Sequence, residues 1–323
     1  MWSGQNQYCI VSASPVSARA VQEPRRMSVQ AAYLGIILIW STTPLTIQWS
    51  TQGMSFSLAV LARMAIGLAT ALAILLAGGT RFPLHSRALL AYFVGGLGLF
   101  TSMALTYWAA RFVHSGLISV MFGLAPLMAG VMATFLLGEK SLTFWKIFGT
   151  LLGVSGLGVI FLHGGSLGGE HFTTGLAALL LSVFCYSACM VSLKRIGDDS
   201  PPLATTVGSL AVSTPLFGLL WFFNDYALPT TVPFRSGAAI VYLGVFGSAI
   251  AFTMYYYVIK HMRATKISLI TLITPVLALL LGNLFNGERI TPSLGIGTAL
   301  ILLGLAAHQH DALAPMLRRR RQR

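Results

Sequence analysis

Charged side chains are scarce in this chain of 323 residues. Only 9% of its residues are Asp, Glu, Lys or Arg, and its mean hydropathy is +0.77, whereas a soluble domain carries about a quarter charged residues. Such a chain cannot hide its apolar surface from water by folding alone, which excludes a water-soluble globular protein. Short segments of alternating polarity are also absent, which excludes a transmembrane β-barrel.

Cysteine is equally rare, with three residues in the chain. Cys185 and Cys189 lie four apart in an apolar stretch, where thiols usually serve as small packing residues. No disulfide framework is predicted. The seven histidines are scattered and form no cluster with Asp, Glu or Cys at metal-ligand spacing, so we expect neither a metal site nor a cofactor.

Long apolar segments make up most of the sequence. Ten stretches are almost free of charge and about long enough for a helix to cross ~30 Å of hydrocarbon. They cover residues 31–50, 54–77, 88–110, 115–137, 143–162, 172–193, 203–223, 236–259, 267–285 and 290–307. The sequence therefore predicts an all-α integral membrane protein with ten transmembrane helices.

The formal net charge of +13 by itself would suggest a protein that binds nucleic acid. The positions of the charges along the chain favour a different explanation. With the N-terminus inside, most of the 21 lysines and arginines fall on the cytoplasmic side, and only Arg111, Arg235 and Arg289 fall outside. This asymmetry is the positive-inside pattern, and it predicts that both termini are cytoplasmic, in the inner (plasma) membrane. We expect the lipid bilayer, and no nucleic acid, to be the partner of the basic residues.

The two ends of the chain are polar. Residues 1–27 show no helical period and are predicted to be a disordered cytoplasmic tail, with Met27 as an alternative translation start. Residues 308–323 contain four consecutive arginines and are predicted to be a basic cytoplasmic tail attracted to anionic lipid.

The chain repeats itself at an offset of 149 residues. Pro126 is followed thirteen residues later by Glu139, and Pro275 is followed thirteen later by Glu288. This spacing predicts two five-helix repeats, residues 31–162 and 172–307. Five crossings are an odd number, so the repeats are inverted relative to each other. We expect both glutamates to cap helix starts at the membrane surface rather than to relay protons.

Arg63 is the only charged residue well inside a predicted span. A cation at that depth costs ~2.5 kcal/mol or more, so it must face the bundle, water or an anionic ligand. A second interpretation is purely structural, with Arg63 bonded to carbonyl groups and fixing the first two helices.

Tyr107 and Trp108 are either an outer aromatic belt or the rim of a cavity. Glycines in residues 143–162 and 290–307 indicate packing seams, with a dimer interface as one use of them.

With these motifs, the chain resembles the drug/metabolite transporter superfamily of the EamA type. The resemblance rests on the two halves, each with Pro126 or Pro275 followed by Gly138-Glu139-Lys140 or Gly287-Glu288-Arg289, and on Trp40, Pro44 and Arg63. It implies inverted repeats that alternate access around a central cavity, lined by the first, third, fourth, sixth, eighth and ninth helices. Members move amino acids, other metabolites, nucleotide sugars or drugs.

We therefore expect a carrier of a small metabolite, an amino acid or related compound, working by efflux as a monomer or homodimer. The expected substrate-binding residues are Trp40, Thr43, Gln48, Arg63, Tyr107, Trp108, Tyr186, Tyr256, Thr271 and Thr274, and the expected hinges are Pro44, Pro126 and Pro275. Because no carboxylate is buried, transport is not expected to use an embedded Asp or Glu proton switch. A translocator of lipids or nucleotide sugars, or a membrane transferase, remains the alternative.

Overall fold

The computed structural model describes residues 28–137, 143–162, 171–224, 226, 228–262 and 264–310. Over these residues the chain is helical and contains no strand. Glu139, the linker at 163–170, the whole predicted N-terminal tail at 1–27 and residues 311–323 lie outside the described residues. The backbone of Tyr256 is described and its side chain is not.

The helices follow the predicted spans closely. They are α1 (Val29–Ser50), α2 (Phe56–Ala77), α3 (Ser86–Ala109), α4 (Ser115–Phe122), α5 (Ala125–Leu137), α6 (Phe144–Leu162), α7 (Phe172–Ile196), α8 (Pro202–Asn224), α9 (Phe234–Tyr242), the π-helix η2 (Leu243–Ile250), α10 (Ala251–His261), α11 (Ala264–Asn286) and α12 (Pro292–His308). Two predicted spans are each built from more than one element: α4 with α5, and α9 with η2 and α10.

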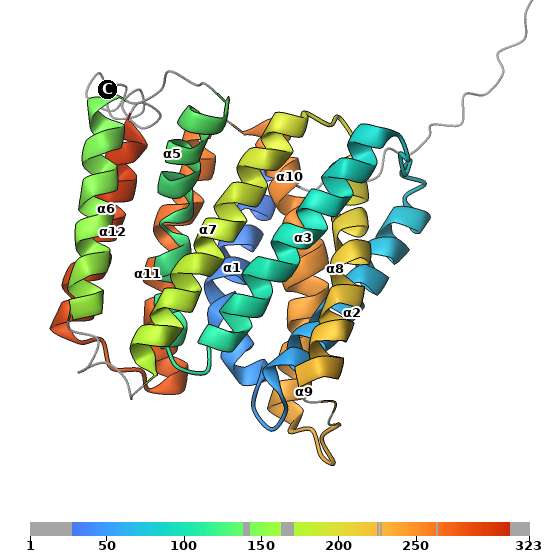
Figure 1. Cartoon of the computed structure of the whole chain (residues 1–323), viewed down its shortest axis with the longest axis horizontal. Helices are drawn as coiled ribbons and strands as arrows, with labels where there is room; N and C mark the ends of the chain where they lie inside the picture. The colour runs from blue at the N-terminus through green and yellow to red at the C-terminus, as the bar shows by residue number, and fades with distance from the viewer. Residues whose placement is uncertain are drawn as a thin grey trace, which may run out of the picture.

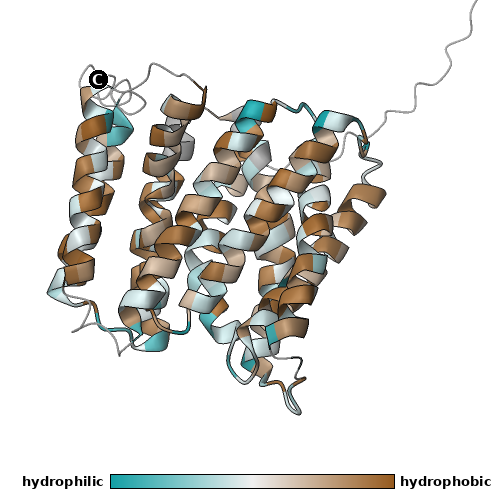
Figure 2. Cartoon of the chain, in the orientation of Figure 1, coloured by the Kyte–Doolittle hydropathy of each residue, from teal (hydrophilic) through white to brown (hydrophobic). Residues whose placement is uncertain are grey.

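Among the described residues, nine spans are long and apolar enough to cross a membrane, and α12 is a shorter apolar tenth. The helices run roughly side by side, with hydrophobic residues along their lengths and hydrophilic residues mostly near their ends (Figure 2). This confirms the prediction of an all-α membrane protein. We call the side where α1 begins and α12 ends the terminal face, and the opposite side the far face (Figure 1).

Helices α6 and α12, the last helix of each repeat, form a pair at one edge of the bundle (Figure 1). Glycines allow their backbones to touch. A Cβ added to Gly156 would lie 2.6 Å from the carbonyl oxygen of Gly297, and one added to Gly297 would lie 2.8 Å from that of Gly156. The predicted glycine seam therefore joins the two repeats within one chain.

The three expected hinge prolines have different surroundings. Helices α4 and α5 are separated at Gly123 and Leu124, just before Pro126. Pro44 and Pro275 instead lie inside helices that continue on both sides.

The π-helix η2 has no counterpart in α3, its partner at the 149-residue offset. The two repeats thus differ where they approach the centre of the bundle.

Candidate functional site

A cavity of about 470 Å³ lies inside the bundle. Its described lining comes from α1, α2, α3, α4, α5, α7, α8, η2, α10 and α11, with none from α6, α9 or α12. The lining includes every helix that the family resemblance implied, and α2 and α8 in addition. The glycine-rich pair α6 and α12 serves packing at the edge.

The cavity brings together most of the residues predicted from the sequence. Its lining includes Trp40, Thr43, Pro44, Arg63, Pro126, Tyr186, Thr271 and Thr274. Gln48, Tyr107, Trp108 and Pro275 are not part of the lining. The side chain of Tyr256 lies outside the described residues, and its neighbour Tyr255 lines the cavity instead.

Arg63 is the only charged residue in the described lining. Its side chain is 5% exposed. Its Nε donates a hydrogen bond to Oγ of Ser248 at 3.2 Å, and Nη1 donates to the hydroxyl of Tyr107 at 3.4 Å. Both partners are neutral, and no carboxylate forms an ion pair with Arg63 within the described part of the chain. The guanidinium therefore carries an uncompensated charge at the cavity wall.

Tyr107 contacts the guanidinium of Arg63 and is not part of the cavity lining. Its side chain is fully buried, with 0% exposure, and its ring centroid lies 5.9 Å from Cζ of Arg63. We expected Tyr107 to contact a ligand, but this structure places it outside the cavity lining. Its hydroxyl accepts a hydrogen bond from Arg63, so Tyr107 contacts the cation rather than the cavity.

Small residues allow η2 to lie against α2 and reach Arg63. A Cβ on Gly67 would lie 2.9 Å from Cβ of Ser248, and one on Gly244 would lie 3.1 Å from the carbonyl oxygen of Arg63. π-Helical stretches are rare and are found frequently at functional sites. Here η2 carries Gly247 and Ser248, which both line the cavity.

Several hydroxyl groups of the lining donate their hydrogen to backbone carbonyl oxygens. Thr43 donates to the carbonyl oxygen of Ile39 at 2.7 Å, and Thr206 donates to that of Pro202 at 3.0 Å. Ser187 donates to backbone oxygens in its own helix and in α5. A hydroxyl that donates to the backbone keeps only its lone pairs for a ligand. These groups are therefore hydrogen-bond acceptors.

Two aromatic pairs give the cavity apolar walls. Trp40 of α1 and Tyr255 of α10 have ring centroids 5.0 Å apart, and Phe122 of α4 and Tyr186 of α7 have centroids 5.7 Å apart. Tyr255, Phe122 and Ser248 also line the cavity and were not among the residues predicted from the sequence. The position of Phe122 four residues before Pro126 was a usable signal, because a proline leaves the backbone carbonyl at that spacing without its helical partner.

The lining changes in exposure from one face to the other. Toward the far face it is buried, with Met64 and Thr106 at 1% exposure and Ile118 at 2%. Toward the terminal face, Leu193 and Thr205 are half-buried. The cavity is thus closed more completely toward the far face.

Polar side chains occupy the far face above this closed end. The amide of Asn286 donates to Oε1 of Gln48 at 2.8 Å, and the amide of Gln48 donates to the carbonyl oxygen of Val113 at 2.6 Å. Oε1 of Glu288 accepts from the backbone N–H of Ser115 at 2.9 Å, and Oε2 accepts from that of Gly116 at 3.3 Å. Gln48, which we expected to contact substrate, belongs to this network and is not part of the cavity lining.

Glu288 caps a helix, as predicted, but a different helix from the one that follows it. The helix that follows, α12, is capped by the hydroxyl of Thr291, which accepts from the N–H of Leu294 at 3.3 Å. Glu288 caps α4, which belongs to the other repeat. The sequence showed that a carboxylate stands near helix starts, but it could not show which start.

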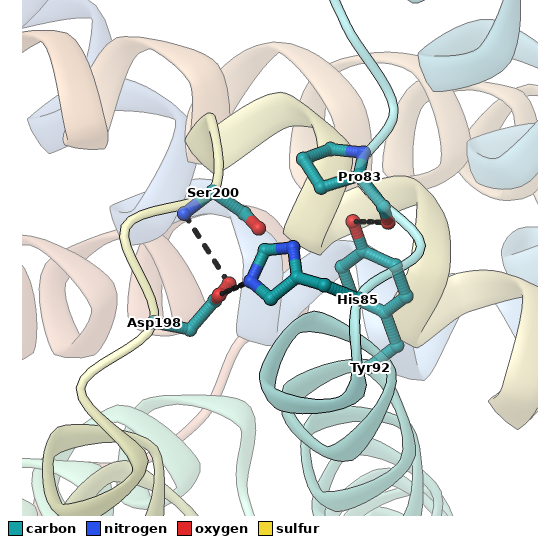
Figure 3. Close-up of polar contacts among 5 residues, drawn as sticks. All are labelled: Pro83, His85, Tyr92, Asp198 and Ser200. Atoms are coloured by element: carbon teal, nitrogen blue, oxygen red, sulfur yellow. Dashed lines mark hydrogen bonds and ion pairs between the residues drawn. The ribbon is translucent and has the colours of Figure 1, made fainter.

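A second polar cluster lies at the terminal face and is not part of the cavity lining. Figure 3 shows the contacts within this cluster. Nε2 of His85 lies 2.9 Å from Oδ1 of Asp198, and the N–H of Ser200 donates to Oδ2 of Asp198 at 3.3 Å. Burial alone would raise the pKa of Asp198, but hydrogen bonds from Ser200 and His85 and the charge of His85 hold that pKa below its usual value. The pair links the loop before α3 to the loop after α7.

No group of three or more His, Cys, Asp or Glu residues in the described ranges has the geometry to hold a metal ion. Cys189 is free and donates a weak hydrogen bond to the carbonyl oxygen of Val94 at 3.5 Å. Neither thiol on α7 belongs to such a group. The polar chemistry of the cavity is therefore that of Arg63 and the hydroxyls.

Comparison with known proteins identifies relatives across most of the chain. An uncharacterized transporter of Archaeoglobus fulgidus is 26% identical over 200 residues, covering 60% of this chain and 67% of that protein. The uncharacterized transporter YvbV of Bacillus subtilis is 27% identical over 200 residues, covering 60% and 63%. A probable terminal-alkyne amino-acid exporter of Streptantibioticus cattleyicolor is 25% identical over 264 residues, covering 80% and 83%. This chain thus spans about two thirds of the length of the first two.

One solved structure shares the fold, with a TM-score of 0.62 at 24% identity over 89% of this chain and 99% of that one. The model of the EamA-like transporter family matches twice, over residues 28–162 and 173–307. These two matches correspond to the two five-helix repeats. The chain belongs to the EamA-like transporter family.

Proposed function

We propose that this protein exports a small metabolite that carries a carboxylate, of the amino-acid type, by alternating access. The single observation that carries the proposal is the guanidinium of Arg63, which lines the cavity without a carboxylate partner in the described structure. A ligand carboxylate at 4 Å would gain about 4 kcal/mol at an effective dielectric of about 20. That gain offsets the cost of keeping the cation at membrane depth.

The other polar groups favour a ligand with a hydrogen-bond donor. Thr43, Ser187 and Thr206 offer acceptors, because their hydrogens are committed to backbone oxygens. An amino group beside the carboxylate supplies the matching donors. The relative from Streptantibioticus cattleyicolor is named an amino-acid exporter, which supports the same class of substrate.

The aromatic pairs favour a substrate with an apolar or aromatic side chain. Trp40 with Tyr255, and Phe122 with Tyr186, provide faces against which such a side chain can pack. The described lining holds no Asp or Glu, so a substrate with net positive charge would meet Arg63 with no counter-charge. We therefore propose that cationic compounds are poor substrates.

The proposed setting follows from the charge pattern of the sequence. We propose the inner (plasma) membrane, with the terminal face in the cytoplasm, because Lys and Arg are concentrated there. A cavity closed more completely toward the far face then fits a carrier waiting for substrate from the cytoplasm. Since no carboxylate lines the described cavity, we propose that no embedded Asp or Glu acts as a proton switch.

The test is transport with and without the guanidinium. Cells expressing the wild-type protein are screened for resistance to amino acids and toxic analogues. Transport of the compound to which the cells become resistant is then measured in proteoliposomes. Its desamino analogue, which lacks the amino group, and its amide, which lacks the carboxylate, are measured in the same way. We expect Arg63→Gln to lower transport roughly thirtyfold or more, because it removes one partner of a buried charge pair.

Arg111→Gln is the control, because Arg111 is an arginine at the far face that does not line the cavity. Its transport should stay near that of the wild type at equal membrane abundance. Undiminished transport by Arg63→Gln would overturn the proposal. Transport of only lipids or nucleotide sugars in the same vesicles would replace it with a translocator of that class.

A further inference from the structure

We infer that Glu288, Asn286 and Gln48 form the far-face gate of this carrier and that α4 is the part they release when the gate opens. The inference goes beyond the proposed substrate, because it concerns how the two repeats are held together at one face. It rests on hydrogen bonds that cross from one repeat to the other.

The first link is the carboxylate of Glu288 on the N-terminus of α4. Both of its oxygens accept backbone hydrogens, from Ser115 at 2.9 Å and Gly116 at 3.3 Å. Glu288 lies after α11 in the second repeat, and α4 belongs to the first repeat. A carboxylate at a helix start satisfies N–H groups that otherwise lack partners and meets the positive end of the helix dipole.

The second link runs through Asn286. Its amide donates to Gln48 of α1 at 2.8 Å, and its oxygen accepts from Nε1 of Trp49 at 2.8 Å. Gln48 in turn donates to the carbonyl oxygen of Val113, in the loop that leads into α4. The end of α11 is therefore bonded to the end of α1 and, through it, to the approach to α4.

The third observation is the shape of α4. It has 8 residues and ends at the break before α5. Ile118, Ser119 and Phe122 of α4 line the cavity. A short helix that is bounded by a break at one end and a carboxylate cap at the other can move as a unit, and moving it would open the buried end of the cavity.

Close packing holds α4 in place while the network is formed. A Cβ on Gly116 would lie 2.8 Å from Cα of Leu279, and one on Gly282 would lie 2.8 Å from Oγ of Ser115. The α4–α11 contact thus depends on two glycines that bring the backbones together. Separating the helices breaks this packing and the Glu288 cap in the same movement.

The experiment measures access to the cavity from the far face. In a background with Cys9, Cys185 and Cys189 replaced by Ser, Ser119→Cys places a thiol on α4 in the cavity lining. A membrane-impermeant methanethiosulfonate reagent is applied from the far side of oriented vesicles, and the labelling rate is measured. No substrate is needed, so the result does not depend on the proposed function.

We expect Glu288→Ala to raise the labelling rate by about two- to thirtyfold, the equivalent of a lost helix cap. Glu288→Gln should give a smaller increase, because the amide keeps one acceptor oxygen and loses the charge. Asn286→Ala should raise the rate as well, because it removes the link to α1. Each variant is compared at equal membrane abundance.

Thr291→Ala is the matched control. Thr291 lies in the same loop and also caps a helix, but it caps α12 of its own repeat. Its loss should leave the labelling rate unchanged. Equal rates in all four variants, or an increase in Thr291→Ala as large as in Glu288→Ala, would overturn the gate. If Glu288→Ala fails to reach the membrane, Asn286→Ala and Glu288→Gln decide the question.

Discussion

The Oγ atom of Ser248 accepts a hydrogen bond from Nε of Arg63 at 3.2 Å, so the second repeat holds the cation that the first repeat supplies. The position of Arg63 therefore depends on how the two repeats meet. Any movement of η2 against α2 will also move the guanidinium. We therefore predict that this contact couples substrate affinity to the conformational state of the carrier.

Ser248→Ala tests this coupling. The substitution removes one acceptor from the guanidinium, which we expect to raise the KM for the transported acid by about tenfold, since a hydrogen bond to a charged group contributes about 1.5 kcal/mol or more. Ser213→Ala is the control, because Ser213 is equally buried and donates only to Leu210 of its own helix. A similar rise in KM for both variants would mean that Ser248 does not position Arg63. KM is measured in proteoliposomes.

Thr43→Val tests the acceptor role of the cavity hydroxyls. We expect it to weaken binding of an amino acid by about 1 kcal/mol or more while leaving binding of the corresponding desamino acid nearly unchanged. Thr46→Val is the control, because Thr46 also donates to backbone oxygens of α1 but does not line the cavity. Binding is measured by competition with the labelled substrate. Equal losses for the amino acid and its desamino analogue would show that Thr43 does not contact the amino group.

Gly297→Ala tests the seam between α6 and α12. The new Cβ would lie 2.8 Å from the carbonyl oxygen of Gly156, and overpacking of this kind costs typically about 1–3 kcal/mol. Gly295→Ala on the same helix meets no atom within 4 Å and should be neutral or slightly stabilising, because alanine favours helix more than glycine does. Thermal unfolding of the detergent-solubilised protein measures both. A wild-type Tm for Gly297→Ala would contradict the close packing.

Asp198→Asn tests the pair at the terminal face (Figure 3). The folded state holds the pKa of Asp198 below its ordinary value, so ionised Asp198 stabilises the fold above its unfolded pKa, and this contribution is lost as pH falls through the folded pKa. We expect the Tm of the wild type to exceed that of the variant at pH 7. The difference should shrink below about pH 4. A difference that does not change with pH would indicate lost packing rather than lost charge.

The sequence by itself determined the number, order and approximate ends of the spans, and the inverted repeat. These properties are local, because hydrocarbon thickness sets the length of an apolar run and one odd count of crossings sets the inversion. The start of α12 was predictable for the same reason, since Thr291 and Pro292 are a cap and a first-turn residue wherever the helix packs. Arg63 was a candidate from its depth alone.

Only the tertiary structure decided which neighbours these residues meet. In the folded chain Tyr107 is buried and contacts Arg63, Tyr255 lines the cavity, and Glu288 caps α4 of the other repeat. Such contacts join positions that are far apart in the chain, and the turn of a helix by a single residue rotates a side chain by about 100°. Hydropathy does not encode that rotation, because a tyrosine that faces the cavity and a tyrosine that supports Arg63 are equally apolar. The rotation is fixed where the two repeats pack together, with η2 of the second repeat against α2 and α11 of the second repeat against α4.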